Sequence, residues 1–152
     1  MNKILITGGA GFIGSNLANK LTAKNYDVVV LDNLSPQIHG ENPELDSPLY
    51  RSLLNNSKLK FIKGSVTSRN DWRKALDGID AVVHLAAETG TGQSMYEIAK
   101  YIEVNITGTA LLLDLLTNEP HSVKRIVVAA SRAIYGEGLY SCSKHGLSHI
   151  HI

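Results

Sequence analysis

The sequence predicts an α/β fold in which helices cover both faces of a parallel, doubly wound sheet. Short apolar runs typical of buried strands alternate with longer segments of helical periodicity along the chain. The first apolar run leads into a glycine-rich turn and a helix, which is the order of a βαβ unit. With 152 residues, of which 43% are hydrophobic, the chain is long enough for one domain with a substantial core.

The first predicted strand, at about residues 2–7, leads into three regularly spaced glycines. Gly8, Gly11 and Gly14 precede and open a helix predicted over about residues 12–24. In such a turn the first glycine permits a tight bend, the second lets the backbone approach a pyrophosphate, and the third allows close helix–strand packing. The helix N-terminus offers N–H groups to the anion. The segment therefore predicts a dinucleotide site of Rossmann type, which also includes Phe12 and Ile13.

The second predicted strand, at about residues 27–32, ends in an acidic residue. Asp32 follows the glycines by about 20 residues, the distance at which a carboxylate binds a ribose 2′-hydroxyl in such folds. A carboxylate there repels a 2′-phosphate, so the sequence predicts NAD rather than NADP. Asn33 belongs to the same strand end. The stretch 33–48 contains three prolines and is expected to be a loop over the adenosine side.

The remaining elements complete the predicted sheet in the order 3-2-1-4-5. Strands are expected at 59–63, 80–85 and 124–130, and helices at 46–56, 69–77 and 92–117. The last two strands are nearly continuous apolar runs, so we expect both to be covered on both faces. His84 is expected to be a hydrogen-bonded core residue. The helix at 92–117 carries a predicted core-facing stripe, made of Met95, Ile98, Ile102, Ile106, Ala110, Leu113 and Leu116.

Composition and charge narrow the classes of partner. The formal net charge is +1 and the basic residues are scattered, so we expect neither a nucleic-acid nor a membrane partner. Cys142 is the only cysteine, and the first strand starts too early for a secretory signal. A cytoplasmic protein is therefore expected. The histidines near the end, His145, His149 and His151, are expected to lie on an exposed terminus, and we predict no metal site.

Five segments together resemble the extended short-chain dehydrogenase/reductases, especially the NAD-dependent nucleotide-sugar epimerases and dehydratases. These segments are 7–14, 30–34, 82–87, 104–109 and 130–136. The resemblance implies NAD as cofactor and hydride transfer at a carbon of a UDP- or dTDP-linked sugar, which is isomerase or dehydratase chemistry. It also implies Ser131 as the catalytic serine that binds the reacting oxygen. Further cofactor contacts are implied for Leu85, Ala86, Ala87 and Asn105.

The chain departs from the family pattern at two places. Ser65 stands where the family has an acid, and a hydroxyl accepts less strongly from an adenine amino group. We assign Ser65 and the backbone N–H of Val66 to this contact. The family's catalytic tyrosine precedes a lysine by four residues, and Tyr140 and Lys144 have this spacing. Flanking glycines favour a loop there, so we expect no working pair. Tyr135 is expected to be a packing aromatic near the substrate pocket.

The family pattern extends well beyond the last matching segment. We therefore expect a dinucleotide-binding domain at 1–135, an irregular tail at 136–152, and truncation before the substrate domain. Two functions remain open: the amino-terminal part of a nucleotide-sugar epimerase or dehydratase, or a dinucleotide-binding fragment that is inactive alone. The family dimerises through the helix corresponding to 92–117 and the Tyr–Lys helix. A weakened homodimer is the expectation here.

Overall fold

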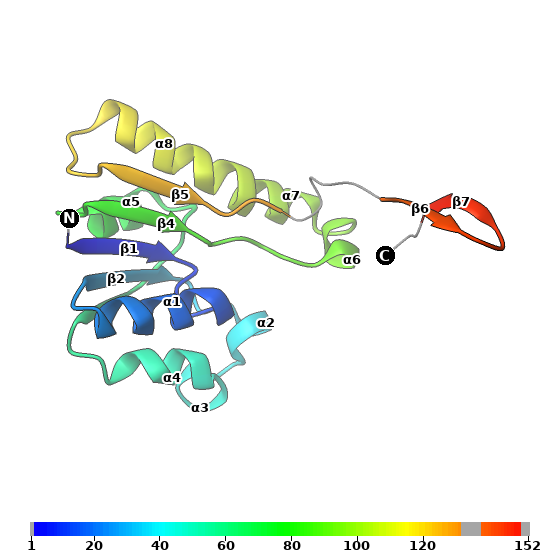
Figure 1. The fold of residues 1–152 in the computed structure, drawn as a ribbon. Helices are drawn as coiled ribbons and strands as arrows, with labels where there is room; N and C mark the ends of the chain where they lie inside the picture. The colour runs from blue at the N-terminus through cyan, green and yellow to red at the C-terminus, as the bar shows by residue number, and fades with distance from the viewer. Residues whose placement is uncertain (1, 132–137, 150–152) are drawn as a thin grey trace.

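The computed structural model describes residues 2–131 and 138–149. Five parallel strands form one sheet in the predicted order β3-β2-β1-β4-β5, and Figure 1 shows the arrowheads of β1, β4 and β5 pointing to the same edge. Their bounds confirm the predicted strands to within two residues: β1 (Lys3–Thr7), β2 (Asp27–Asp32), β3 (Leu59–Lys63), β4 (Ala81–His84) and β5 (Arg125–Val128). β1 is central, with Ile4 paired to Val28 of β2 and to Ala81 of β4.

Helices cover both faces of the sheet, as predicted for a three-layer fold. They are α1 (Phe12–Ala23), α4 (Pro48–Leu54), α5 (Arg69–Leu76) and α8 (Gly108–Asn118). Successive side chains of β1 point to opposite faces. Ile6 packs in one buried cluster with Ala18 of α1, and Leu5 packs in the other with Trp72 of α5 and Leu112 of α8.

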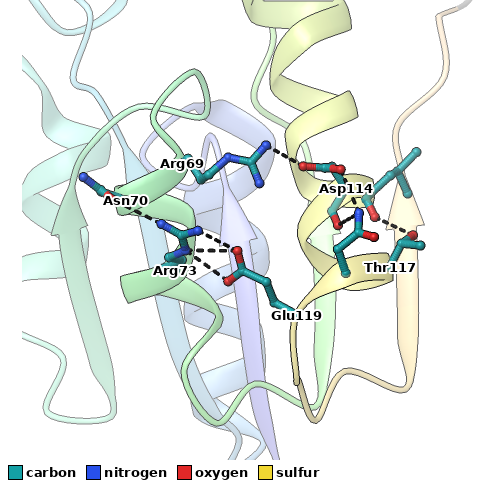
Figure 2. Close-up of polar contacts among 8 residues, drawn as sticks. Arg69, Asn70, Arg73, Asp114, Thr117 and Glu119 are labelled. Carbon is teal, nitrogen blue, oxygen red and sulfur yellow. Dashed lines mark hydrogen bonds and ion pairs between the residues drawn. The ribbon is translucent and has the colours of Figure 1, made fainter.

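Ion pairs join α5 to α8, the two helices that cover one face of the sheet (Figure 2). The guanidinium of Arg73 donates to both carboxylate oxygens of Glu119, at 2.6 Å from Nη2 and 3.0 Å from Nε, and Arg69 pairs with Asp114. The arginines hold the pKa values of Asp114 and Glu119 below their usual range. Because all four side chains are partly exposed, solvent screens these pairs. They link α5 and α8 at the surface, while the buried contacts between these helices hold them together.

The single helix predicted over 92–117 is wrong. The structure has a separate α6 (Thr91–Ser94), then α7 (Ile98–Tyr101), a π-helical segment η1 (Ile102–Thr107) and α8 in succession. The predicted core stripe is also wrong, because Met95 is 67% exposed and Ile106 is 63% exposed. Gly108 lies on the face that packs: a Cβ there would lie 2.9 Å from Val66 Cγ2, so the missing side chain allows this close approach. Leu112 and Leu115, on the face of Gly108, are buried instead.

Two further expectations need correction. β5 is not covered on both faces: the side chains of Ile126, Val127 and Val128 are 37% to 51% exposed, because β5 is an edge of the described sheet. The stretch 33–48 is not only loop. It contains α2 (Pro36–His39) and α3 (Pro43–Asp46), each beginning with a proline at the first helical position, where the missing N–H costs nothing.

The segment after Ser131 is not irregular where the structure describes it. β6 (Leu139–Cys142) and β7 (Gly146–His149) form an antiparallel hairpin, with Cys142 paired to Gly146. Gly146 has φ of +74°, a left-handed conformation that suits glycine at the start of β7. Lys144 therefore lies in a turn, and Tyr140 and Lys144 do not share a helix face. Among the described residues, no helix is long and apolar enough to cross a membrane.

Candidate functional site

The glycine turn after β1 is shaped by close backbone contacts. Gly8 has φ of +64°, and a Cβ there would lie 2.8 Å from Ala86 N. A Cβ at Gly14 would lie 2.4 Å from Gly8 O. Gly11 is different: its φ of −70° suits any residue, and a Cβ would meet only Gly8 O, at 3.3 Å. Packing therefore requires glycine at positions 8 and 14, but it does not by itself require glycine at position 11.

Helix α1 begins at this turn. Gly11 is its N-cap, so no side chain caps the helix, and the first turn contains no acidic residue. The first N–H groups of a helix have no intrahelical partner and carry the positive end of the helix dipole. Phe12 and Ile13, at the start of the helix, are 74% and 67% exposed. These features make the turn suitable for an anion.

Asp32 links the end of β2 to the glycine turn. Its carboxylate is 8% exposed and accepts from Ala10 N and from Leu34 N, both at 2.9 Å. Each oxygen keeps a second lone pair that can accept from a ligand hydroxyl. The buried His39 of α2 places Nε2 3.7 Å from Asp32 Oδ1, while its Nδ1 lies 3.0 Å from Ser47 Oγ. Asp32 thus holds the loop in place and also faces the cavity.

His84, at the end of β4, is the hydrogen-bonded core residue that the sequence predicts. Thr109 Oγ1 donates to Asn105 O, so it must accept from His84 Nε2–H at 3.0 Å. Nδ1 is then the acceptor, and Thr7 Oγ1 donates to it at 2.7 Å. The Thr7 oxygen also accepts from the backbone N–H groups of Leu85 and Ala86, both at 3.2 Å. Burial lowers the pKa of His84, in keeping with this neutral imidazole.

The loop after β4 is held from the opposite side by η1. Asn105 accepts from Glu88 N at 2.8 Å and donates to Glu88 O at 3.1 Å, as a second strand would. π-helical turns often occur at functional sites, and this one carries Asn105. The Glu88 carboxylate pairs with Lys100 at 3.3 Å. Backbone and side-chain bonds therefore fix both ends of the segment Leu85–Glu88.

In the loop after β3, Ser65 stands where the family has an acid, and an acid from α5 contacts the loop instead. Asp71, on α5, accepts from Ser65 N at 3.1 Å, and this bond lowers the pKa of the carboxyl. The Ser65 hydroxyl lies 2.9 Å from Thr67 Oγ1. Val66 is buried, and its carbonyl accepts from Trp72 Nε1 at 2.7 Å. The acid on α5 therefore supports the backbone of this loop.

These loops surround one cavity of 1070 Å³ at the carboxyl ends of the strands. Every residue that the sequence assigns to the cofactor lines it, and so does Ser131. The set comprises Gly8, Gly11, Phe12, Ile13, Gly14, Asp32, Asn33, Ser65, Val66, Leu85, Ala86, Ala87 and Asn105. Lys144 does not line the cavity, and Tyr135 lies outside the described residues.

Sequence reasoning missed several residues of this cavity. His39, Gln37 and Tyr101 line it, although none of them lies in a motif or an apolar pattern. α2 brings the first two back to the site, and α7 brings the third. Pro36, the first residue of α2, was the available signal for this helix, because a proline is frequent at a first helical position.

Comparisons with known proteins match this geometry. The model of the NAD dependent epimerase/dehydratase family matches residues 4–146. The chain is 39% identical over 140 residues to a dTDP-L-rhamnose 4-epimerase of Burkholderia thailandensis, covering 91% of this chain and 37% of that protein. It is 37% identical over 145 residues to a dTDP-D-glucose 4,6-dehydratase of Dictyostelium discoideum, covering 91% and 31%.

A solved structure is also similar. The UDP-glucuronic acid 4-epimerase of Bacillus cereus, in complex with UDP-glucuronic acid and NAD, matches with a TM-score of 0.76 and 33% identity, over 93% of this chain and 44% of that one. The chain thus spans less than half the length of each of these three similar proteins.

Proposed function

Because the chain belongs to the NAD dependent epimerase/dehydratase family, we propose that it is the part of such an enzyme that binds NAD. The binding site is the cavity at the carboxyl ends of the strands. One observation carries this assignment: the glycine turn, the Asp32 carboxylate and the loop after β4 all face the same 1070 Å³ space. Such a volume suits a ligand of dinucleotide size.

Three features of the cavity fit the dinucleotide. The uncapped N-terminus of α1 suits a pyrophosphate, and Gly11 leaves the backbone accessible there. Asp32 has acceptor capacity left for a ribose hydroxyl. On the adenine side we assign Ser65 and Val66. On the nicotinamide side we assign Leu85, Ala86, Ala87 and Asn105.

When bound, NAD would supply the acceptor for a hydride from a sugar carbon. We assign Ser131, just beyond β5, to hydrogen-bond the reacting sugar oxygen. Its place in the cavity lining supports this role. The turn position of Lys144 supports the expectation that Tyr140 and Lys144 are not the proton-transfer pair. We therefore propose the NAD-binding part of a nucleotide-sugar epimerase or dehydratase as the main function, and a dinucleotide-binding fragment that is inactive alone as the alternative.

We also propose a substrate class, an oligomeric state and a cellular location. UDP- and dTDP-linked sugars are favoured by the names of the similar proteins. For the assembly we propose a weakened homodimer, which the exposed apolar side chains of Ile102 and Ile106 support. A cytoplasmic location is favoured by the single, unpaired cysteine.

Calorimetric titration tests the cofactor, with NAD and NADP titrated separately into the chain. We expect NAD to bind more tightly, and tighter binding of NADP would contradict the role of Asp32. A turnover assay with UDP-glucose and with a dTDP-sugar separates the two functions. Robust epimerisation by the 152-residue chain would establish the enzyme and exclude the purely binding module.

A further inference from the structure

Two glutamines form a reciprocal amide pair between α2 and α6. Gln37 Nε2 donates to Gln93 Oε1 at 3.0 Å, and Gln93 Nε2 donates back to Gln37 Oε1 at 3.0 Å. Each amide therefore uses its carbonyl and its NH₂ toward the other. This contact joins segments that are far apart in the sequence but face the same cavity.

The Gln93 side chain is held from α7 as well. Its Oε1 also lies 2.9 Å from the hydroxyl of Tyr101, and its Nε2 also donates to Glu97 Oε1 at 3.3 Å. The Gln93 amide thus has partners on α2 and at both ends of α7. Lys100 pairs with Glu97 at 3.1 Å and with Glu88 at 3.3 Å, which ties the same network to the loop after β4.

The sheet topology puts the two helices that carry this pair on either side of the end of β1. α2 follows β2 and α6 follows β4, whereas β1 lies between those two strands. A bond from α2 to α6 must therefore pass the carboxyl end of β1, where the glycine turn begins. Figure 1 shows both helices beyond the arrowheads of the strands. Gln37 and Ile38 line the cavity from one side, and Thr91 and Ser94 line it from the other.

We propose that the Gln37–Gln93 pair is a gate over the dinucleotide cavity. The pair closes above the pyrophosphate position and must part when NAD enters or leaves. This inference rests on the proposed NAD binding. A gate slows both the association and the dissociation of a ligand, whereas a residue that only contacts the bound ligand mainly changes the dissociation rate. The two roles therefore leave different kinetic signatures.

The test uses stopped-flow fluorescence with NADH as the probe and excess NAD to displace it. Gln37→Met, Gln93→Met and the double variant keep the side-chain length but remove the amides. Asn70→Ala, an exposed amide on α5 outside the cavity, is the matched control. We expect each gate variant to raise both the association and the dissociation rate constants by about threefold to tenfold, since two neutral hydrogen bonds are lost.

Coupling between the two glutamines is the second readout. Because the pair acts as one unit, the double variant should exchange NADH no faster than the faster single variant. Suppose that the parent chain binds NADH. The gate alone would then be overturned if the effects of the two substitutions multiply, if only the dissociation rate rises, or if the variants exchange NADH at the parent's rates. Absence of NADH binding by the parent chain would overturn the proposed function, and the gate with it.

Discussion

Gly11 and Gly14 lie three residues apart, but the structure predicts opposite consequences for alanine at the two positions. At Gly14 the added Cβ would lie 2.4 Å from Gly8 O and 2.5 Å from Gly9 Cα. Both contacts are with backbone, which cannot rotate away, so Gly14→Ala is expected to lower the free energy of unfolding by about 1–3 kcal/mol. The displaced turn should also weaken NAD binding.

At Gly11 the added Cβ meets one atom, at 3.3 Å, and the backbone conformation suits alanine. The weaker N-cap and the reduced entropy of the unfolded chain act in opposite directions, so Gly11→Ala should change stability by less than about 1 kcal/mol. If the pyrophosphate approaches the backbone here, the methyl group excludes it. We then expect NAD affinity to fall by at least about tenfold, which corresponds to about 1.4 kcal/mol.

Urea unfolding measures the stability of each variant, and calorimetry measures NAD binding. Gly92→Ala is the control, because its Cβ would have no neighbour within 4 Å, and it should change neither quantity appreciably. A Gly11→Ala protein that is folded and binds NAD as tightly as the parent would refute the placement of the pyrophosphate at this turn. A Gly14→Ala protein of undiminished stability would refute the packing argument.

Three further predictions use the same site and surface. Asp32→Ala should weaken NAD binding and reduce the preference for NAD over NADP in calorimetric titrations, because it removes the carboxylate that repels a 2′-phosphate. The folded-state pKa of His84 is lowered, so its contribution to stability should be complete above the unfolded pKa of about 6.5 and should fall as the pH drops below it, by at most about 1.4 kcal/mol per pH unit. Urea unfolding at pH 7.5 and 5.5 should show this loss in the parent and not in His84→Gln. Ile102→Glu and Ile106→Glu alter exposed positions, so they should leave the unfolding midpoint unchanged while reducing any self-association seen in sedimentation, and a dimer that survives both changes would contradict the proposed interface.

Local sequence patterns were sufficient for the sheet and for the cofactor loops. The run 28–31 is apolar at every position, as is typical of a strand buried on both faces. Asp32 ends this strand, and the glycines follow the neighbouring strand β1. Because the carboxyl ends of parallel strands lie at one edge, strand order alone placed these residues together. The wrong prediction of a core stripe over 92–117 has a different origin. The helical segments over 98–118 are apolar on more than one face, and the close approach of Gly108 to Val66 marks the face that is buried.

The sequence by itself determined the strand order, the glycine turn and the acidic residue that faces it, because these depend on periodicity and on spacing within one βαβ unit. The tertiary structure alone decided which helix face is buried, how His84 is hydrogen-bonded, and that Gln37 bonds Gln93. Those contacts join residues distant in sequence, through side chains whose types carry no local signal. Their geometry exists only after the sheet has brought its strand ends to a common edge.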